Sequence, residues 1–170
     1  RQRIKQAENI PQVQKEKLFK HRGAYSNKAQ KSKQALNIFV NPGRGISLKD
    51  NVSIDMPGKH MMGRGRQSSQ GTVTYKGEKN FDNVVKNLDG DALQLHVVIK
   101  SPKAPTEYEY TFNDDVTLTK ATNGEEEGVA ILNEETSDLE GIVRAPWAKD
   151  DSGQKIDTFF EIEDNTLIQH

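Results

Sequence analysis

The chain has 170 residues, with 24 Lys and Arg against 25 Asp and Glu, and it contains no cysteine. This length predicts one domain with an extension. The lack of cysteine excludes disulfide scaffolds and cysteine-based metal or redox sites. Only 33% of the residues are hydrophobic, and no apolar run is long enough for a transmembrane segment.

The charge is divided between the two halves of the sequence. Residues 1–66 hold 15 Lys and Arg and 4 Asp and Glu, a net charge of +11, whereas residues 67–170 hold 9 and 21, a net charge of −12. Such asymmetry is typical of an interaction arm beside a folded body, or of two parts that attract each other. Because large apolar residues are sparse at the start of the chain, we expect a basic extension over residues 1–35 and a β-rich domain over residues 36–170.

The basic extension is expected to be helical. Residues 12–21 contain good helix formers, Gly23 is suited to end a helix, and residues 28–35 follow as a second helix. Such helices need a surface to lie on, because their apolar stripe is thin. We therefore expect them to dock on an acidic face of the β-rich domain, in the same molecule or a neighbour. The apolar residues that would hold them are Val13, Leu18 and Phe19.

From Leu36 onward the apolar residues alternate with polar ones, which predicts roughly ten to twelve short strands. The clearest hairpin signal is Asp89-Gly90 between two alternating arms. Spacing of this kind predicts a mainly β chain, an antiparallel β-sandwich or barrel-like sandwich with a short N-terminal helical extension. The expected strands cover residues 36–40, 46–48, 52–54, 71–75, 83–88, 91–99, 108–112, 116–119, 129–132, 139–143, 158–162 and 166–168.

No pattern in the sequence matches a catalytic or metal site. The four histidines are not at metal-ligand spacing, and neither a Gly-x-Ser-x-Gly elbow nor a P-loop is present. The acidic runs lack the alternating oxygen ligands of a calcium loop. The sequence therefore favours a protein without catalytic residues, a metal or a cofactor.

Two Gly-Arg-Gly triplets are the main candidates for anion binding, at residues 43–45 and 63–65. Glycine lets backbone N–H groups approach an anion, and arginine adds bidentate contacts. The candidate binding residues here are Arg44, Arg64 and Arg66, with His60 in the same basic loop. The alternative interpretation of both triplets is a flexible, solvated loop.

The lysines of the extension and the single tryptophan complete the candidate set. Lys15, Lys28 and Lys31 could neutralise phosphates. Nucleic acid is nevertheless disfavoured, because few aromatic residues lie near these lysines and the second half of the chain is acidic. Trp147 lies in Ala-Pro-Trp-Ala-Lys, which favours a core plug, with a sugar-stacking platform as the alternative.

Several segments of the second half resemble a known family. One is Ala-Pro-Thr-Glu-Tyr at residues 104–108, another is Val-Ala-Ile-Leu at 129–132, and a third is Pro-Trp-Ala-Lys-Asp at 146–150, continued through 158–169. Together they make residues 70–170 similar to an exported, β-rich and mostly uncharacterised domain family of Gram-positive bacteria. The resemblance implies a β-rich module that is secreted or associated with the cell wall. It supplies no catalytic residues.

These observations favour a non-catalytic extracellular interaction or stalk module of a larger exported bacterial protein. Its expected partner is a protein, or a second copy, bound through the basic N-terminal segment. One alternative is a binding module for an anionic cell-wall polymer. A second alternative is the pro-region of a secreted toxin or hydrolase.

Overall fold

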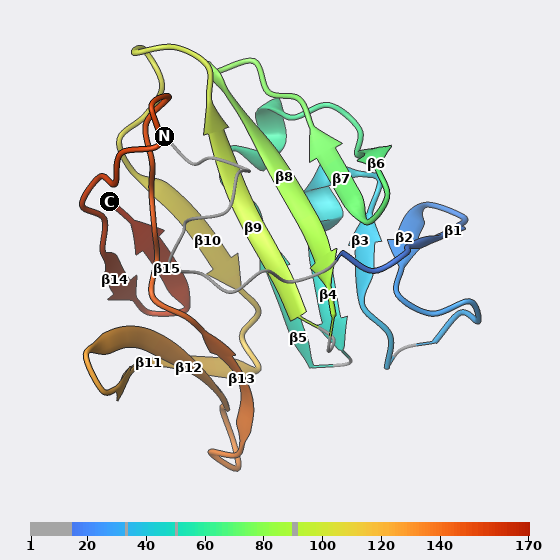
Figure 1. The fold of residues 1–170 in the computed structure, drawn as a ribbon. Helices are drawn as coiled ribbons and strands as arrows, with labels where there is room; N and C mark the ends of the chain where they lie inside the picture. Colours follow the sequence, from blue (N-terminus) through green and yellow to red (C-terminus); the bar gives the residue numbers. More distant parts are fainter. Residues whose placement is uncertain (1–14, 33, 50, 90–91) are drawn as a thin grey trace.

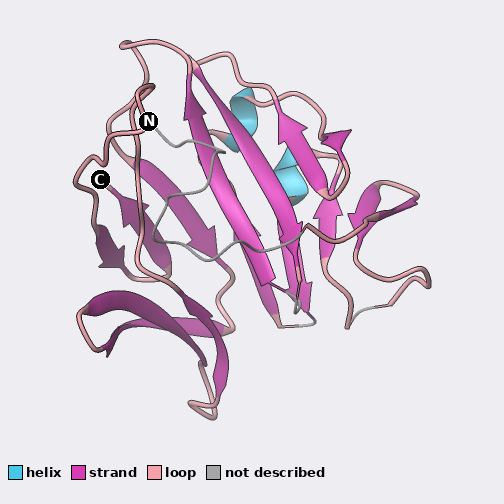
Figure 2. Cartoon of the chain, in the orientation of Figure 1, coloured by secondary structure: helices cyan, strands magenta, loops and turns pink. Residues whose placement is uncertain are grey.

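The computed structural model describes residues 15–170 except 33, 50, 90 and 91, and its chain is mainly β (Figures 1 and 2). The pairings between its strands are antiparallel, as the sequence predicts. Two short 3-10 helices are described, η1 (Pro42–Arg44) and η2 (Lys59–Met61). The strands are β1 (Phe19–His21), β2 (Ala24–Ser26), β3 (Asn37–Phe39), β4 (Ile46–Lys49), β5 (Val52–Asp55), β6 (Arg66–Ser69), β7 (Thr72–Tyr75), β8 (Phe81–Leu88), β9 (Ala92–Ile99), β10 (Tyr108–Phe112), β11 (Val116–Asn123), β12 (Glu126–Asn133), β13 (Leu139–Val143), β14 (Phe160–Glu163) and β15 (Thr166–Gln169).

The strands form three sheets. The largest has eight strands in the order β1-β2-β3-β4-β5-β10-β15-β14, and two smaller sheets have the orders β6-β7-β8-β9 and β11-β12-β13. The four-stranded sheet lies across β3–β5, and the three-stranded sheet lies at the opposite end, below β10 and β15 in Figure 1. The eight-stranded sheet is therefore the element that connects both ends of the molecule.

Apolar side chains from facing sheets make the core. One cluster joins the eight-stranded sheet to the four-stranded sheet and includes Leu18, Tyr25, Ile38, Ile46, Val73, Tyr75 and Val85. A second cluster joins it to the three-stranded sheet and includes Ile54, Tyr110, Phe112, Leu118, Val129, Ile131 and Leu167. Alternation along the strands produces these faces, because successive side chains of a strand point to opposite sides. In β10, for example, the buried residues are Tyr108, Tyr110 and Phe112.

The hairpins that the sequence marks most clearly are formed. β8 and β9 pair over their whole length, from Phe81 opposite Ile99 to Leu88 opposite Ala92. β14 and β15 also pair as a hairpin, and Asp164 in its turn has a φ of 54°. Aspartate and asparagine tolerate this left-handed conformation better than most residues do.

The predicted helical extension is wrong over the described residues. Residues 19–26 form the hairpin β1–β2, whose turn holds Gly23 with a φ of 78°. A glycine in this conformation suits both the end of a helix and a hairpin turn, and pairing of β2 with β3 selects the hairpin. Residues 27–32 and 34–36 lie in a loop closed by Asn27, which accepts a hydrogen bond from the Leu36 amide at 2.9 Å.

The described part of the leader, from Lys15 onward, contacts the body through the core. Leu18 is 4% exposed and packs in the first core cluster, and Phe19 is half-buried. The amide of Glu16 donates to the carbonyl oxygen of Asn87 at 2.9 Å, which ties the leader to β8. Val13, the third residue expected to hold the leader, lies outside the described residues. Among the described residues, no helix is long and apolar enough to span a membrane.

Candidate functional site

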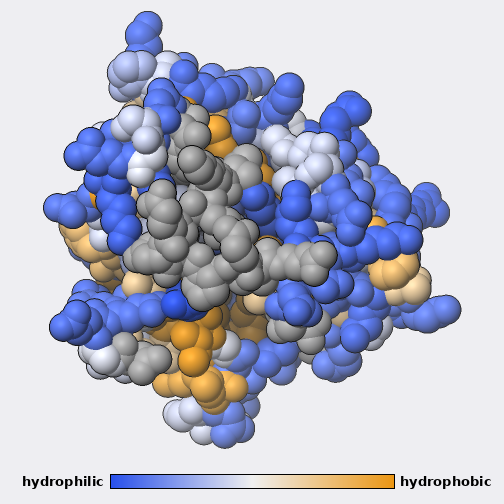
Figure 3. Space-filling view, viewed as in Figure 1, coloured by the Kyte–Doolittle hydropathy of each residue, from blue (hydrophilic) through white to orange (hydrophobic). Residues whose placement is uncertain are grey.

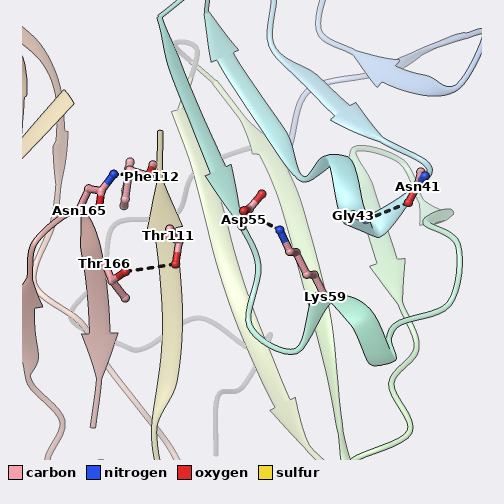
Figure 4. A network of polar contacts seen from close by, with 8 residues as sticks. All are labelled: Asn41, Gly43, Asp55, Lys59, Thr111, Phe112, Asn165 and Thr166. Carbon is pink, nitrogen blue, oxygen red and sulfur yellow. Dashed lines mark hydrogen bonds and ion pairs between the residues drawn. The ribbon is translucent and has the colours of Figure 1, made fainter. Parts of the chain in front are cut away.

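The surface formed by β1–β3, η1, η2 and β6 is called the basic end, and it gathers four of the predicted binding residues. Arg44, His60, Arg64 and Arg66 are exposed. None of them has an ion-pair partner among the described residues. Lys59 differs, because its ammonium pairs with Asp55 at 2.8 Å (Figure 4). Most of the positive charge here is therefore not neutralised within the described chain.

The fold brings the two Gly-Arg-Gly triplets to the same end of the eight-stranded sheet. The Gly65 amide donates to the carbonyl oxygen of Val40 at 2.8 Å, so the second triplet lies against the residue that follows β3. The first triplet comes directly afterwards in η1, and η1 lies beside η2. Arg44, Arg64 and His60 therefore approach one surface from separate segments.

Two tyrosine hydroxyls fix the segment that carries Arg64 and Arg66. The Tyr75 hydroxyl donates to the carbonyl oxygen of Phe39, and the Gln67 amide donates to the Tyr25 hydroxyl at 3.3 Å. Burial raises the pKa of Tyr75 well above its usual range, so its hydroxyl keeps the proton that it donates. A Cβ on the glycine between the two arginines would lie 2.6 Å from the Tyr75 ring, and only glycine allows this approach.

The glycine amides of both triplets are used inside the protein. The Gly43 amide donates to the Asn41 side chain at 2.9 Å (Figure 4). The amides of Gly45 and Gly63 donate to carbonyl oxygens at 3.2 and 2.8 Å, and that of Gly65 binds Val40 as described. The triplets thus shape the backbone, and the arginine side chains present the charge.

Aromatic rings support two of the cations. The Arg44 guanidinium lies over the Phe39 ring, 3.9 Å from its centroid. The Lys20 ammonium lies 4.4 Å from the centroid of the Tyr25 ring. Such cation–π contacts orient a side chain without cancelling its charge. Phe39 and Tyr25 were not predicted as site residues, although Phe39 precedes the first triplet closely in the sequence.

Trp147, another of the predicted site residues, lies on the same sheet face as Arg66. Arg66 lies opposite Thr74, which lies opposite Val84, which in turn lies opposite His96. Residues paired in this way point to the same side of a sheet. The ring of half-buried Trp147 contacts buried His96 edge-on, at 5.4 Å between centroids. His96 thus lies on the same face of the four-stranded sheet as Arg66, a position that its spacing from the other histidines did not reveal.

Lys15 reaches the same face from the leader. Its ammonium donates to Ser69 at 3.2 Å and to Thr72 at 3.4 Å. Thr72 lies opposite Lys86, which is 6% exposed. Burial, and then the charge of Lys15, lower the pKa of Lys86.

The other two predicted lysines are separate from the arginines. Lys28 and Lys31 are exposed on the loop between β2 and β3. The Lys28 carbonyl oxygen lies 2.9 Å from Nε2 of His21. Among the described residues, no hydrogen bond or ring contact joins either lysine to Arg44, Arg64 or Arg66.

Two of the segments that carry the family resemblance meet at a hollow of about 340 Å³. One wall is made by Ala104, Pro105, Thr106 and Tyr108, and Ala148 and Thr158 contribute to another. The Thr158 hydroxyl donates to the carbonyl oxygen of His170 at 2.6 Å, which ties the residue after β15 to this wall. The hollow shares no lining residue with the basic end, so the segments of the resemblance and the arginines form separate features.

Chemically, the basic end offers guanidinium groups on a fixed backbone, and the described residues include no group of metal-binding side chains. Guanidinium groups bind phosphate and carboxylate oxygens through paired N–H donors. In comparisons with known proteins, no family model matches the chain, and neither the curated proteins nor the solved structures include a match.

Proposed function

We propose that this chain is a non-catalytic β-sandwich module that binds an anionic linear polymer through its basic end. The observation that carries the proposal is the set of exposed arginines, Arg44, Arg64 and Arg66, that have no carboxylate partner among the described residues. Their segments are instead held by backbone and tyrosine hydrogen bonds.

The polymer fits this surface better than a single small anion does. The cations extend from Lys20 on β1 through η1 to Arg66 on β6. Arg66 lies on the sheet face that Trp147 contacts through His96. Repeated phosphates or carboxylates would meet several of these cations at once. Such binding weakens as the salt concentration rises, because it releases counterions of the polymer into solution. An exported location is consistent with the resemblance of residues 70–170, and it would make anionic cell-wall polymers the natural ligand.

The test measures retention on purified Gram-positive cell wall at low and high salt. One sample of wall keeps its anionic polymers and a second sample has been stripped of them. We expect salt-sensitive retention on the first sample only. The triple variant Arg44→Ala, Arg64→Ala, Arg66→Ala should lower the dependence of log affinity on log salt by about 1 per lost contact.

A matched control removes the same charge elsewhere. The variant Lys103→Ala, Lys120→Ala, Lys155→Ala also loses three positive charges, from exposed lysines outside the basic end, and it should bind as the unmodified protein does. Equal loss in both variants would show that only net charge matters and would contradict the proposal. Stronger retention on single-stranded DNA or RNA than on cell wall would assign the basic end to nucleic acid instead.

A further inference from the structure

β13 (Leu139–Val143) is an edge strand with one open side. It is the last strand of the sheet β11-β12-β13 and pairs only with β12. On its other side, none of the described residues makes a backbone hydrogen bond to it. The row of N–H and C=O groups on such an edge is a template for a further strand.

The same strand exposes large apolar side chains. Leu139 is 57% exposed and Ile142 is 64% exposed, and together they make up half of the large hydrophobic residues that are exposed in the described chain. Leu139 lies opposite Leu132, and Ile142 lies opposite Ala130. An apolar patch is visible at this place in Figure 3, over the β11–β13 sheet.

Two other edge strands, β6 and β14, carry charges of the kind that usually prevent strand addition. β6 begins with exposed Arg66 and has only exposed polar residues. β14 alternates exposed Glu161 and Glu163 with its apolar residues. Within β13 the only charged residue is Glu140, whose carboxylate forms an ion pair with the Lys49 ammonium at 3.6 Å. β13 therefore lacks the protection that β6 and β14 have.

The charge around this edge indicates which kind of chain would bind there. The acidic end, defined here as residues 114–144 with the sheet β11-β12-β13, holds nine Asp and Glu against two Lys and Arg, a net charge of −7. Two copies that paired edge to edge would bring two acidic ends together, and like charges at close range oppose association. A basic segment would be attracted instead.

We propose that β13 is a docking edge for an extended, basic segment of a partner protein, which adds to the three-stranded sheet as a fourth strand. Main-chain hydrogen bonds along the open edge supply affinity, as in other strand additions. Apolar side chains at alternate positions of the segment cover Leu139 and Ile142. Basic side chains at the remaining positions face the carboxylates of the acidic end. This edge is separate from the basic end, so the protein has two binding surfaces of opposite charge.

The probe is a fluorescein-labelled peptide, Lys-Val-Lys-Val-Thr-Val-Lys, and fluorescence anisotropy measures its binding to the full chain. Two further peptides carry N-methyl groups on alternate residues, one peptide for each register, so each has one edge that cannot donate backbone hydrogen bonds. We expect N-methylation in one register to weaken binding by about tenfold or more, because strand addition needs these N–H donors. A peptide with Glu in place of Lys should bind still more weakly.

Variants locate the site on the protein. The double variant Leu139→Thr, Ile142→Thr reduces apolar surface at exposed positions while β-branched residues keep the strand favourable. It should bind the basic peptide several-fold more weakly. The matched control Ile156→Thr changes an exposed isoleucine that lies outside the sheet, and it should leave binding unchanged. The triple arginine variant of the basic end should also leave it unchanged, which separates this proposal from the proposed polymer binding.

Two results would overturn the proposal. If both N-methylated peptides bind as well as the parent, the contact is charge alone and no strand is added. If sedimentation shows that the unmodified chain self-associates and the double variant does not, the occupant of the edge is a second copy.

Discussion

At the basic end Arg44, Arg64 and Arg66 have no carboxylate partner among the described residues, whereas at the acidic end several carboxylates are paired. Arg144 binds Glu126 through two nitrogens at 3.1 and 3.2 Å, and Lys120 lies 3.2 Å from Glu127. Cations at the basic end rest on aromatic rings instead. The difference teaches that charge at one end is partly used for local pairing, while charge at the other is presented to the surroundings.

The largest expected effect on the free energy of unfolding comes from a Leu→Ala substitution, which can be compared between the leader and the acidic end. Leu18→Ala should lower the free energy of unfolding by about 2–5 kcal/mol, because it opens a cavity in the first core cluster. Leu139→Ala, at an exposed position of the acidic end, should change it by less than about 0.5 kcal/mol. Urea unfolding measures both. Similar values for the two variants would show that the leader is not part of the core.

Next in size is a comparison of two glycines with nearly the same backbone. Gly45 has a φ of 66° and Gly124 has a φ of 67°. A Cβ at Gly45 would lie 2.2 Å from the Ile54 carbonyl oxygen, whereas nothing lies within 4 Å at Gly124. Gly124→Ala should cost about 1–2 kcal/mol for the left-handed conformation alone. Gly45→Ala should cost about 3 kcal/mol, at the upper end of ordinary substitutions. Thermal unfolding tests this difference, and equal losses would refute the close approach.

A smaller effect separates two buried tyrosines. Tyr75→Phe removes the hydroxyl that binds Phe39 and should cost about 1 kcal/mol. The Tyr108 hydroxyl is buried without a hydrogen-bond partner among the described residues, so Tyr108→Phe should leave stability unchanged or raise it by about 1 kcal/mol. Unfolding of both variants in guanidinium chloride measures these changes. A clear loss in Tyr108→Phe would reveal a partner for this hydroxyl.

Tyr108 should also make the stability of the fold depend on pH in the alkaline range. Burial raises the pKa of Tyr108 to about 12, above the value of about 10 in an unfolded chain. The stability linked to its protonated form is thus complete below about pH 10 and is lost as the pH rises toward about 12. The difference in melting temperature between the unmodified chain and Tyr108→Phe should shift in favour of the variant over this range. A constant difference would contradict the raised pKa.

The smallest effect concerns the Glu126–Arg144 pair of the acidic end. Hydrogen bonds from Arg144, and then from the Ala145 amide, lower the pKa of Glu126. Its contribution is therefore present above the unfolded pKa of about 4.3 and is lost as the pH falls below that value. Melting curves measure this effect. The unmodified chain should melt at a higher temperature than Glu126→Gln at pH 7, and this difference should shrink as the solution is acidified to pH 3. An unchanged gap would mean that the pair does not contribute.

The short β-arms could be predicted because their signal is local. Alternation in Tyr108–Phe112 marks one buried face, and Asp89-Gly90 joins two long arms, so each segment carries its own evidence. The leader could not be predicted in the same way, since Lys17–His21 has helix formers and Gly23 serves helix ends and hairpin turns alike. Its conformation depends on a pairing partner, β3, and that partner is not a property of the segment itself.

The candidate site was likewise predictable only in part. The residue types of Arg44, Arg64 and Arg66 follow from the Gly-Arg-Gly triplets. Their common location depends on the hydrogen bond from Gly65 to Val40 and on the Tyr75 hydroxyl, which come from strands distant in sequence. The link between Arg66 and Trp147 depends on strand register across β6–β9, and no local pattern specifies that register.

The order of residues alone determined that this chain alternates into short antiparallel strands and that its positive charges precede its negative ones, because both properties are written in neighbouring residues. Only the tertiary structure decided that this order along the chain also separates the charges in space. The strands β1–β3 lie at one end of the eight-stranded sheet, and the separate sheet β11-β12-β13 packs near its other end, against β10 and β15. The physical reason is that apolar burial, acting between strands far apart in sequence, selects the pairing of the sheets, and the charges follow the strands that carry them.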